Sequence, residues 1–208
     1  MHMAYDTSVF INCPFDNDYD QFFDAALFAI YRCKFKPRCA LEINDAGDLR
    51  IDKINKIIKE CKVGIHDISR TELDEDSGLP RFNMPLELGL FLGAKKFSST
   101  QKQKNKHTII VDRERHRYQR YISDIAGQDI MAHNNTTDDL IRIIRNALNS
   151  YGIVDALPSA QIIIQDYNKF LDLKPEICAG SQLDINDLTY SDKTRIIELY
   201  LEFNASVN

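Results

Sequence analysis

From residue 7 to about residue 150, two patterns of apolar and polar residues alternate along this chain. Short apolar runs bounded by turn residues predict strands, and longer stretches with an apolar residue every three or four positions predict helices. The strands expected on this basis cover residues 8–13, 37–42, 63–69, 108–112 and 129–134. The expected helices cover residues 16–33, 51–61, 84–96, 117–126 and 136–151.

Such alternation predicts βαβ units and hence an α/β fold with a parallel sheet covered by helices on both faces. Five strands suit a flavodoxin-like, doubly wound sheet with the strand order 2-1-3-4-5. Ligands of such sheets bind beyond the carboxyl ends of the strands. The loops at residues 13–18, 43–50, 67–83 and 112–117 are therefore the places where a site is expected.

The strand pattern ends at Pro158, and two amphipathic helices are expected after it, at residues 159–173 and 191–203. We therefore divide the chain into a flavodoxin-like domain at 5–152 and a C-terminal helical extension at 153–208. This extension either packs on the α/β body or forms a surface for a homo-oligomer.

Composition narrows the classes of function. The chain of 208 residues carries a formal net charge of −5, which disfavours binding to a nucleic-acid backbone. No apolar run is long enough to cross a bilayer, so no membrane association is expected. The five cysteines are odd in number and form no CxxC pair, which indicates free thiols in a reducing, cytoplasmic compartment. The histidines lack the spacing of metal ligands, so no metal is expected.

One carboxylate stands out in the apolar segment RFNMPLELGLFLG, residues 81–93. With a helix beginning near Asn83, the helical repeat places Glu87 on the apolar stripe of Met84, Leu90 and Phe91. A carboxylate among apolar neighbours has a raised pKa, as catalytic acids, bases and nucleophiles commonly do. The alternative is a structural one, in which Glu87 favours the helix dipole or completes a capping box.

Further polar residues are expected at the same edge of the sheet. Asp67 ends the third strand, and Glu87 opens the helix that follows it, so both should face one crevice. Asn12 and Asp16 flank the first turn between strand and helix, which should border that crevice too. His66, adjacent to Asp67, points to the opposite side of its strand and is expected in the core.

The residues Asp67-Ile68-Ser69, followed by Asn83-x-x-x-Glu87-Leu88-Gly89, resemble a motif of the nucleoside 2-deoxyribosyltransferase family. The opening Tyr5-Asp6-Thr7-Ser8-Val9-Phe10-Ile11-Asn12, followed by Asp16 and Asp18, looks like a TIR domain. Through the segments SVFINCPFD, PRCALE, IHDISR and PRFNMPLELGLFLGA, the whole sequence is also similar to a bacterial group of nucleotide-binding or TIR-like proteins that often occur among antiviral defence effectors. These resemblances cover about residues 5–150 and imply a TIR-like variant of the flavodoxin-like fold.

The resemblance implies that Glu87 acts on the anomeric carbon of a nucleoside or of NAD, and that Asp67 assists near the base. In the same picture Asn83 holds a ribose hydroxyl or fixes Glu87, and Phe15 or Phe82 stacks on a base. Arg70 and Arg81 contact a phosphate or, alternatively, pair with the acidic run Glu72, Asp74, Glu75 and Asp76. The substrate-binding residues expected are Asn12, Pro14, Phe15, Asp16, Ser69, Arg81, Phe82 and Asn83.

The function expected from these features is cleavage of the N-glycosidic bond of NAD or a related nucleotide, in a bacterial antiviral defence or signalling role. NAD or the nucleotide is then a substrate, and no cofactor is expected. Two alternatives stay open: a non-catalytic nucleotide-binding scaffold that oligomerises or contacts a partner effector protein, and a salvage enzyme that transfers 2-deoxyribosyl groups.

Overall fold

The computed structural model describes residues 5–43, 45, 47–73 and 77–207. Its sheet contains the strands β1 (Ser8–Asn12), β2 (Lys36–Arg38), β3 (Val63–Asp67), β4 (His107–Asp112) and β5 (Met131–Ala132). All neighbouring strands are parallel, and their order is β2-β1-β3-β4-β5. The predicted flavodoxin-like order is therefore confirmed.

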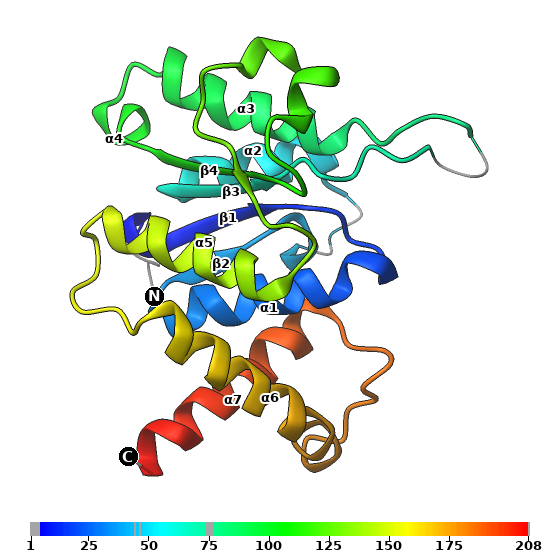
Figure 1. Ribbon diagram of the computed structural model, residues 1–208, viewed down its shortest axis with the longest axis vertical. Coiled ribbons are helices and arrows are strands. Elements are labelled where there is room, and N and C mark those ends of the chain that lie inside the picture. The colour runs from blue at the N-terminus through cyan, green and yellow to red at the C-terminus, as the bar shows by residue number, and fades with distance from the viewer. Residues whose placement is uncertain (1–4, 44, 46, 74–76, 208) are drawn as a thin grey trace.

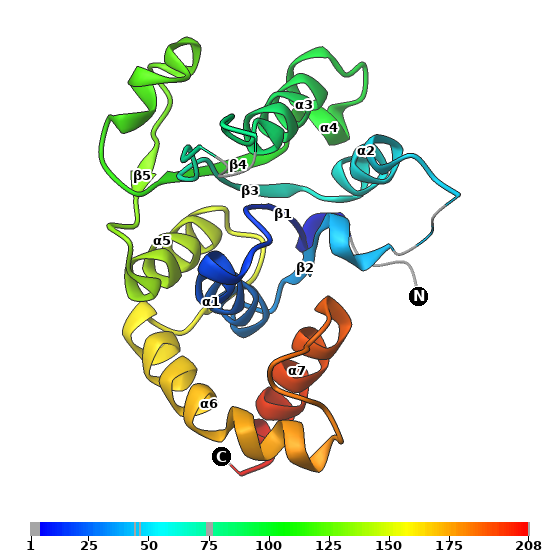
Figure 2. The same cartoon turned by 90° about the vertical axis from the view of Figure 1, so that its right-hand side faces the viewer.

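Helices cover both faces of the sheet, as the alternating pattern predicts (Figure 1). They are α1 (Asp20–Arg32), α2 (Arg50–Glu60), α3 (Asn83–Phe97), α4 (Gln101–Lys104), α5 (Thr137–Ser150), α6 (Ala160–Gly180) and α7 (Tyr190–Val207). Helices α1 and α5 lie on one face, and α2 and α3 lie on the other. Helices α6 and α7 form a further layer that packs against α1 on the side away from the sheet (Figure 2).

Strand residues point alternately to the two faces, and each face has its own apolar core. Val9 and Ile11 of β1 belong to the core shared with α1 and α5, whereas Phe10 packs with Phe91 of α3 on the other face. Gly64 in β3 is required by this second core. A Cβ atom at Gly64 would lie 2.7 Å from the rings of Phe91 and His66, so no larger residue fits without a shift.

The fifth strand is shorter than predicted, at Met131–Ala132, and α6 continues past the predicted end to Gly180. Two further predicted elements differ from the structure in kind or extent. The expected strand at 37–42 is shorter, because the chain turns into a 3-10 helix at Ala40–Glu42, which an ion pair between Arg38 and Glu42 fastens. The expected helix at 117–126 is wrong. That segment forms two 3-10 helices, Arg117–Arg120 and Ser123–Ile125.

The irregular structure of segment 117–126 is explained by contacts with the buried carboxylate of Asp112 and with Ile68. The Tyr121 hydroxyl donates to the backbone oxygen of Ile68 at 2.8 Å and lies 2.9 Å from Oδ2 of Asp112. Asp112 is 0% exposed and also holds Arg117 through an ion pair of 2.6 Å. These anchors fasten the segment across the ends of β3 and β4, and a continuous helix would not place both side chains there.

The C-terminal helices share the core of the α/β body. The ring of Phe28 in α1 packs against Tyr167 and Phe170 of α6 and Tyr200 of α7, with centroid distances of 5.4, 5.3 and 5.8 Å. Asp24 of α1, only 4% exposed, binds Lys174 of α6 at 2.6 Å and Lys193 of α7 at 2.7 Å. The extension is thus fastened to α1 by both apolar and ionic contacts.

The structure also describes the cysteines and the apolar character of the helices. All five cysteines are free and buried. Among the described residues, no helix combines the length and the apolar character needed to cross a membrane.

Candidate functional site

Glu87 lies in the second turn of α3, near the carboxyl edge of the sheet, and only 5% of its surface is exposed. Its buried neighbours in the helix are Met84, Leu88 and Phe91. No described residue donates a hydrogen bond to its carboxylate or forms an ion pair with it. Burial raises the pKa of Glu87 from 4.5 to about 7, against the opposing effect of the nearby Arg50 guanidinium. The predicted apolar setting of this carboxylate is therefore present, and Glu87 exchanges its proton near neutral pH.

The start of α3 is fixed by Asn12, the last residue of β1. The Asn12 side chain is 1% exposed, and its Nδ2 donates to the backbone oxygen of Met84 at 2.8 Å. The same Nδ2 lies 3.0 Å from Nδ1 of His66 in the neighbouring strand. This amide therefore links two strand ends to the helical turn that precedes Glu87. Asn12 is a positioning residue, because its contacts are with the protein and lie within the core.

His66 occupies the core beneath α3, as predicted from its position next to Asp67. Its ring packs against Phe10 and Phe91 at centroid distances of 5.8 and 5.0 Å. Burial, assisted by the charge of Lys106, lowers the pKa of His66 to about 3, so the ring is neutral. Because Nδ1 accepts the hydrogen bond from Asn12, the proton of this neutral ring resides on Nε2.

Asp67 belongs to a different set of contacts. It is 1% exposed, accepts a hydrogen bond of 2.5 Å from the Tyr19 hydroxyl and accepts another of 2.8 Å from the Ser69 N–H. Nε2 of His133 lies 3.4 Å from Oδ2, the oxygen that also accepts from Tyr19. Burial raises the pKa of Asp67, but the hydrogen bond and charge of His133, with the bonds from Ser69 and Tyr19, outweigh it and leave the pKa below 3.8. Asp67 is thus ionised and engaged by the protein itself.

His133 follows β5 and completes the group around Asp67. Its Nδ1 accepts a hydrogen bond of 3.2 Å from the N–H of Asn135, so in the neutral ring the proton lies on Nε2, the atom nearer to Asp67. The ring also packs on Phe22 of α1 at a centroid distance of 5.2 Å. The group therefore ties the beginning of α1, the end of β3 and the end of β5 together.

The expected crevice with Glu87 and Asp67 side by side is not what the contacts describe. Asp67 follows Val63 and Ile65 toward the face of α1 and α5, whereas Glu87 belongs to α3 on the opposite face. Cys13, just past β1, is buried near both carboxylates. Burial raises the pKa of its thiol well above the ordinary value, and the charges of Asp67 and Glu87 add to that rise. The thiol is therefore protonated.

Apart from Asn12 and Asp16, the predicted substrate-binding residues fall into two groups. Pro14 and Ser69 are buried, and Phe15 packs edge-on against Phe23 at 5.2 Å, so these side chains are part of the fold. Arg81, Phe82 and Asn83 are exposed at the start of α3, within two turns of Glu87. The second group is the part of the predicted set that a ligand at Glu87 can reach.

Asp16 and the two arginines of the loop after β3 form a surface ionic group. Asp16 Oδ1 accepts the Tyr19 N–H at 3.2 Å, and its Oδ2 lies 3.5 Å from Arg70 and 3.8 Å from Arg81. Arg70 also contacts Asp18 at 3.0 Å and Glu72 at 3.7 Å. Arg70 thus pairs mainly with Asp18 and Asp16, and among the described residues of the acidic run it contacts Glu72. The other acidic residues of that run, Asp74, Glu75 and Asp76, lie outside the described residues.

Sequence reasoning missed Tyr19, His133 and Arg50. Tyr19 lies in a 3-10 turn before α1, and His133 follows a strand of two residues, so neither has a periodic pattern that marks its direction. Arg50 is the first residue of α2 and stands in a loop already expected to border the site. The sequence feature that could have indicated Arg50 as a site residue is its positive charge at the start of a helix.

Comparison with known proteins leaves the site to be interpreted by its own geometry: no protein-family model matches the chain, and no curated protein matches it.

Proposed function

We propose that this protein cleaves the N-glycosidic bond of NAD or a related nucleotide, with Glu87 as the carboxylate that acts on the anomeric carbon. The observation that carries this proposal is the state of Glu87. Only 5% of the residue's surface is exposed, no described residue pairs with its carboxylate, and it lies at the edge of the sheet where ligands of this fold bind. An unpaired carboxylate in such a place costs stability, which favours a functional role over a structural one.

The chemistry asked of Glu87 is the stabilisation of positive charge. When the bond between the anomeric carbon and the base nitrogen breaks, its electron pair leaves with the base and the sugar becomes an oxocarbenium-like cation. The ionised Glu87 stabilises this cation or forms a covalent bond to its carbon, and water or another acceptor then completes the reaction. An apolar surrounding strengthens the attraction between the carboxylate and the cation.

The engagement of Asp67 favours a cationic base as the leaving group. With its oxygens held by Tyr19, Ser69 and His133, Asp67 is not available to protonate a departing base. Nicotinamide leaves NAD as a neutral molecule without taking up a proton, because its ring nitrogen is already positively charged. A neutral adenine or thymine base would need an acid. One active carboxylate therefore suits NAD better than a deoxynucleoside.

Exposed residues around Glu87 supply contacts for the rest of such a substrate. Arg50 at the start of α2 is exposed and close enough to lower the pKa of Glu87. Its guanidinium suits a phosphate group. Phe82 is 66% exposed and offers a ring face for stacking on a base, and Asn83 is exposed beside it. We assign these three residues to substrate binding.

The decisive experiment measures release of free nicotinamide from NAD by chromatography. We expect turnover with the native protein and a loss of at least about a thousandfold with Glu87→Gln, because the amide cannot stabilise the cation. Glu176→Gln, at an exposed position of α6, is the matched control and should keep full turnover. Full turnover by Glu87→Gln, in a variant that still unfolds cooperatively, would contradict the proposed mechanism.

One observation favours the alternative of a nucleotide-binding scaffold. A carboxylate with a pKa of about 7 is protonated in about half of the molecules at neutral pH, and the second carboxylate is withdrawn into the fold. Such a site can bind a nucleotide without cleaving it. Saturable binding of NAD without nicotinamide release would support this function, with homo-oligomers or a partner effector as the output. Exchange of one free base for another on a deoxynucleoside would instead indicate a salvage transferase. Either enzyme or scaffold fits the proposed role in bacterial antiviral defence or signalling.

A further inference from the structure

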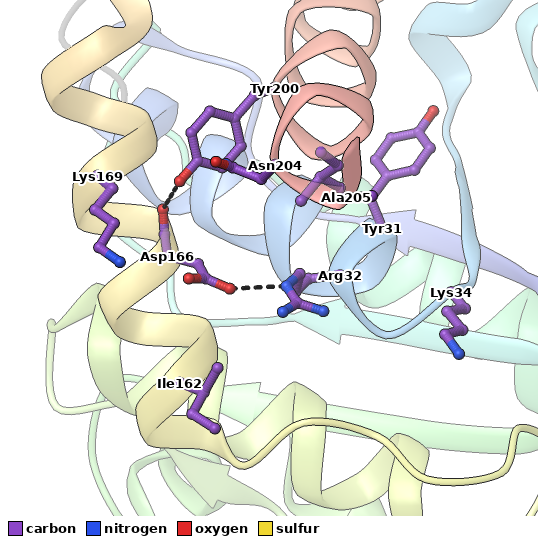
Figure 3. A pocket seen from close by; sticks show the side chains of 10 residues that line it. Tyr31, Arg32, Lys34, Ile162, Asp166, Lys169, Tyr200, Asn204 and Ala205 are labelled. Carbon is purple, nitrogen blue, oxygen red and sulfur yellow. Dashed lines mark hydrogen bonds and ion pairs between the residues drawn. The ribbon is translucent and has the colours of Figure 1, made fainter. Parts of the chain in front are cut away.

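A hollow lies at the opposite end of α1 from the strand ends near Glu87. Its volume is about 580 Å³, which is within the usual range of about 300–1,000 Å³ for small-molecule pockets. The C-terminal end of α1 and one side each of α6 and α7 form its walls (Figure 3). Because α1 runs antiparallel to the strands, this place is at the amino edge of the sheet, so it is separate from the site described above.

Three cationic side chains line this hollow: Arg32 and Lys34 from the end of α1, and Lys169 from α6. Figure 3 shows Arg32 between the two lysines. Arg32 is held in place by Asp166, whose Oδ2 lies 2.8 Å from its Nε, and the Tyr200 hydroxyl donates to the backbone oxygen of Asp166 at 3.0 Å. With one anionic lining residue against three cations, the hollow has an excess of positive charge.

The backbone of Lys34 gives an independent indication of function. Lys34 has a left-handed conformation, with φ at 63°, in the turn that ends α1. Its N–H donates to the oxygen of Tyr31, and the N–H of Phe35 donates to the oxygen of Ile30, which is the Schellman arrangement. Glycine is the usual residue at this position, because a side chain costs free energy there. Lys34 thus occupies a strained backbone position and also lines the pocket, which is consistent with a use for its charge.

Apolar surface lies next to the cations. Ile162 of α6 is 46% exposed, and Leu201 of α7 and the ring of Tyr31 also line the hollow. A ligand that fits therefore carries several negative charges along part of its length and an apolar or aromatic group on the remainder.

We propose that this hollow binds a small molecule that carries an oligophosphate chain and an attached ring, as a nucleoside diphosphate does. The phosphates lie along Lys34, Arg32 and Lys169, and the ring lies on one of the apolar side chains that line the hollow beside them, Tyr31, Ile162 or Leu201. Guanidinium and ammonium groups are the side chains that bind phosphate best. The proposal does not depend on catalysis at Glu87.

The test is calorimetric titration of the full chain with ADP, pyrophosphate, citrate and adenosine at low and at physiological salt. We expect ADP to bind most tightly, pyrophosphate more weakly, and adenosine and citrate least. Lys34→Gly should weaken ADP binding about tenfold and raise the thermal unfolding temperature, because it removes a charge and relieves the left-handed strain. Lys169→Gln should also weaken binding about tenfold. Lys96→Gln, at an exposed position of α3, is the matched control and should bind ADP like the native chain.

The combination expected for Lys34→Gly, a more stable protein that binds less, separates this proposal from general destabilisation. Native affinity for ADP in both Lys34→Gly and Lys169→Gln would overturn it. Adenosine binding as tightly as ADP would overturn the role of the phosphates, and citrate binding as tightly as ADP would show a site for carboxylates instead. Loss of ADP binding in Glu87→Gln would place the ligand at the other site. If Glu87→Gln binds ADP like the native chain but no longer releases nicotinamide, the two proposals concern two distinct sites.

Discussion

Replacing Glu87 by glutamine should stabilise the fold at alkaline pH, even though it removes the residue proposed to carry the chemistry. The ordinary pKa of 4.5 applies to the unfolded chain, and burial raises the pKa in the folded state to about 7. Each pKa unit corresponds to about 1.4 kcal/mol, so the difference of about 2.5 units corresponds to about 3 kcal/mol.

The sign follows from the number of protons bound in each state. Between pH 4.5 and about 7, folded Glu87 keeps its proton while the unfolded chain has lost it. The free energy of unfolding therefore falls as the pH rises through this range, and the whole cost of about 3 kcal/mol is present above pH 7. Below pH 4.5 both states are protonated, and this cost is absent.

Urea unfolding of native protein and of Glu87→Gln at about pH 5 and about pH 8 measures this effect. We expect the variant to gain about 2–3 kcal/mol relative to native protein between the two pH values. Glu176→Gln, at an exposed position, should show no such gain. An equal difference between native protein and Glu87→Gln at both pH values would refute the reasoning, because it would mean that Glu87 titrates alike in both states.

Three further predictions concern the same region. Nicotinamide release should fall as the pH drops below about 7, because only ionised Glu87 can act; a kcat/KM that stays level from about pH 5.5 to 8 would contradict this. Tyr19→Phe should lower the free energy of unfolding by about 1–3 kcal/mol, measured in urea, because Asp67 loses one of its donors. Gly64→Ala should cost about 1–3 kcal/mol through overpacking. Gly89→Ala, where an added Cβ meets nothing within 4 Å, should instead be neutral or gain up to about 1 kcal/mol in the same assay.

The order of the strands and the burial of Glu87 were predictable because both depend on local patterns. The run of apolar residues in β4 marks a buried strand, and the helical repeat alone places Glu87 on an apolar stripe. The tyrosine-rich segment 117–126 was not predictable in this way. Its 3-10 turns depend on Asp112 and Ile68, which a pattern within the segment does not contain.

The group around Asp67 shows a different limit of sequence reasoning. Topology brings the ends of neighbouring parallel strands to one edge, so Asp67 and Glu87 were both expected there. The sheet has two faces, however, and side chains along β3 point to them alternately. Asp67 points to the face that α3 does not cover. Tyr19 and His133, which engage Asp67, come from short irregular turns whose direction only the folded chain defines.

The packing of Phe28 has a practical consequence for anyone who shortens this chain. A fragment that ends at residue 152 would leave Phe28, which is 0% exposed in the full chain, without the three rings that cover it. It would also leave the buried Asp24 without both of its lysines. We expect such a fragment to aggregate, because it exposes an apolar patch beside an unpaired carboxylate. Expression boundaries, and searches for homologous domains, should therefore retain α6 and α7 as part of the folding unit.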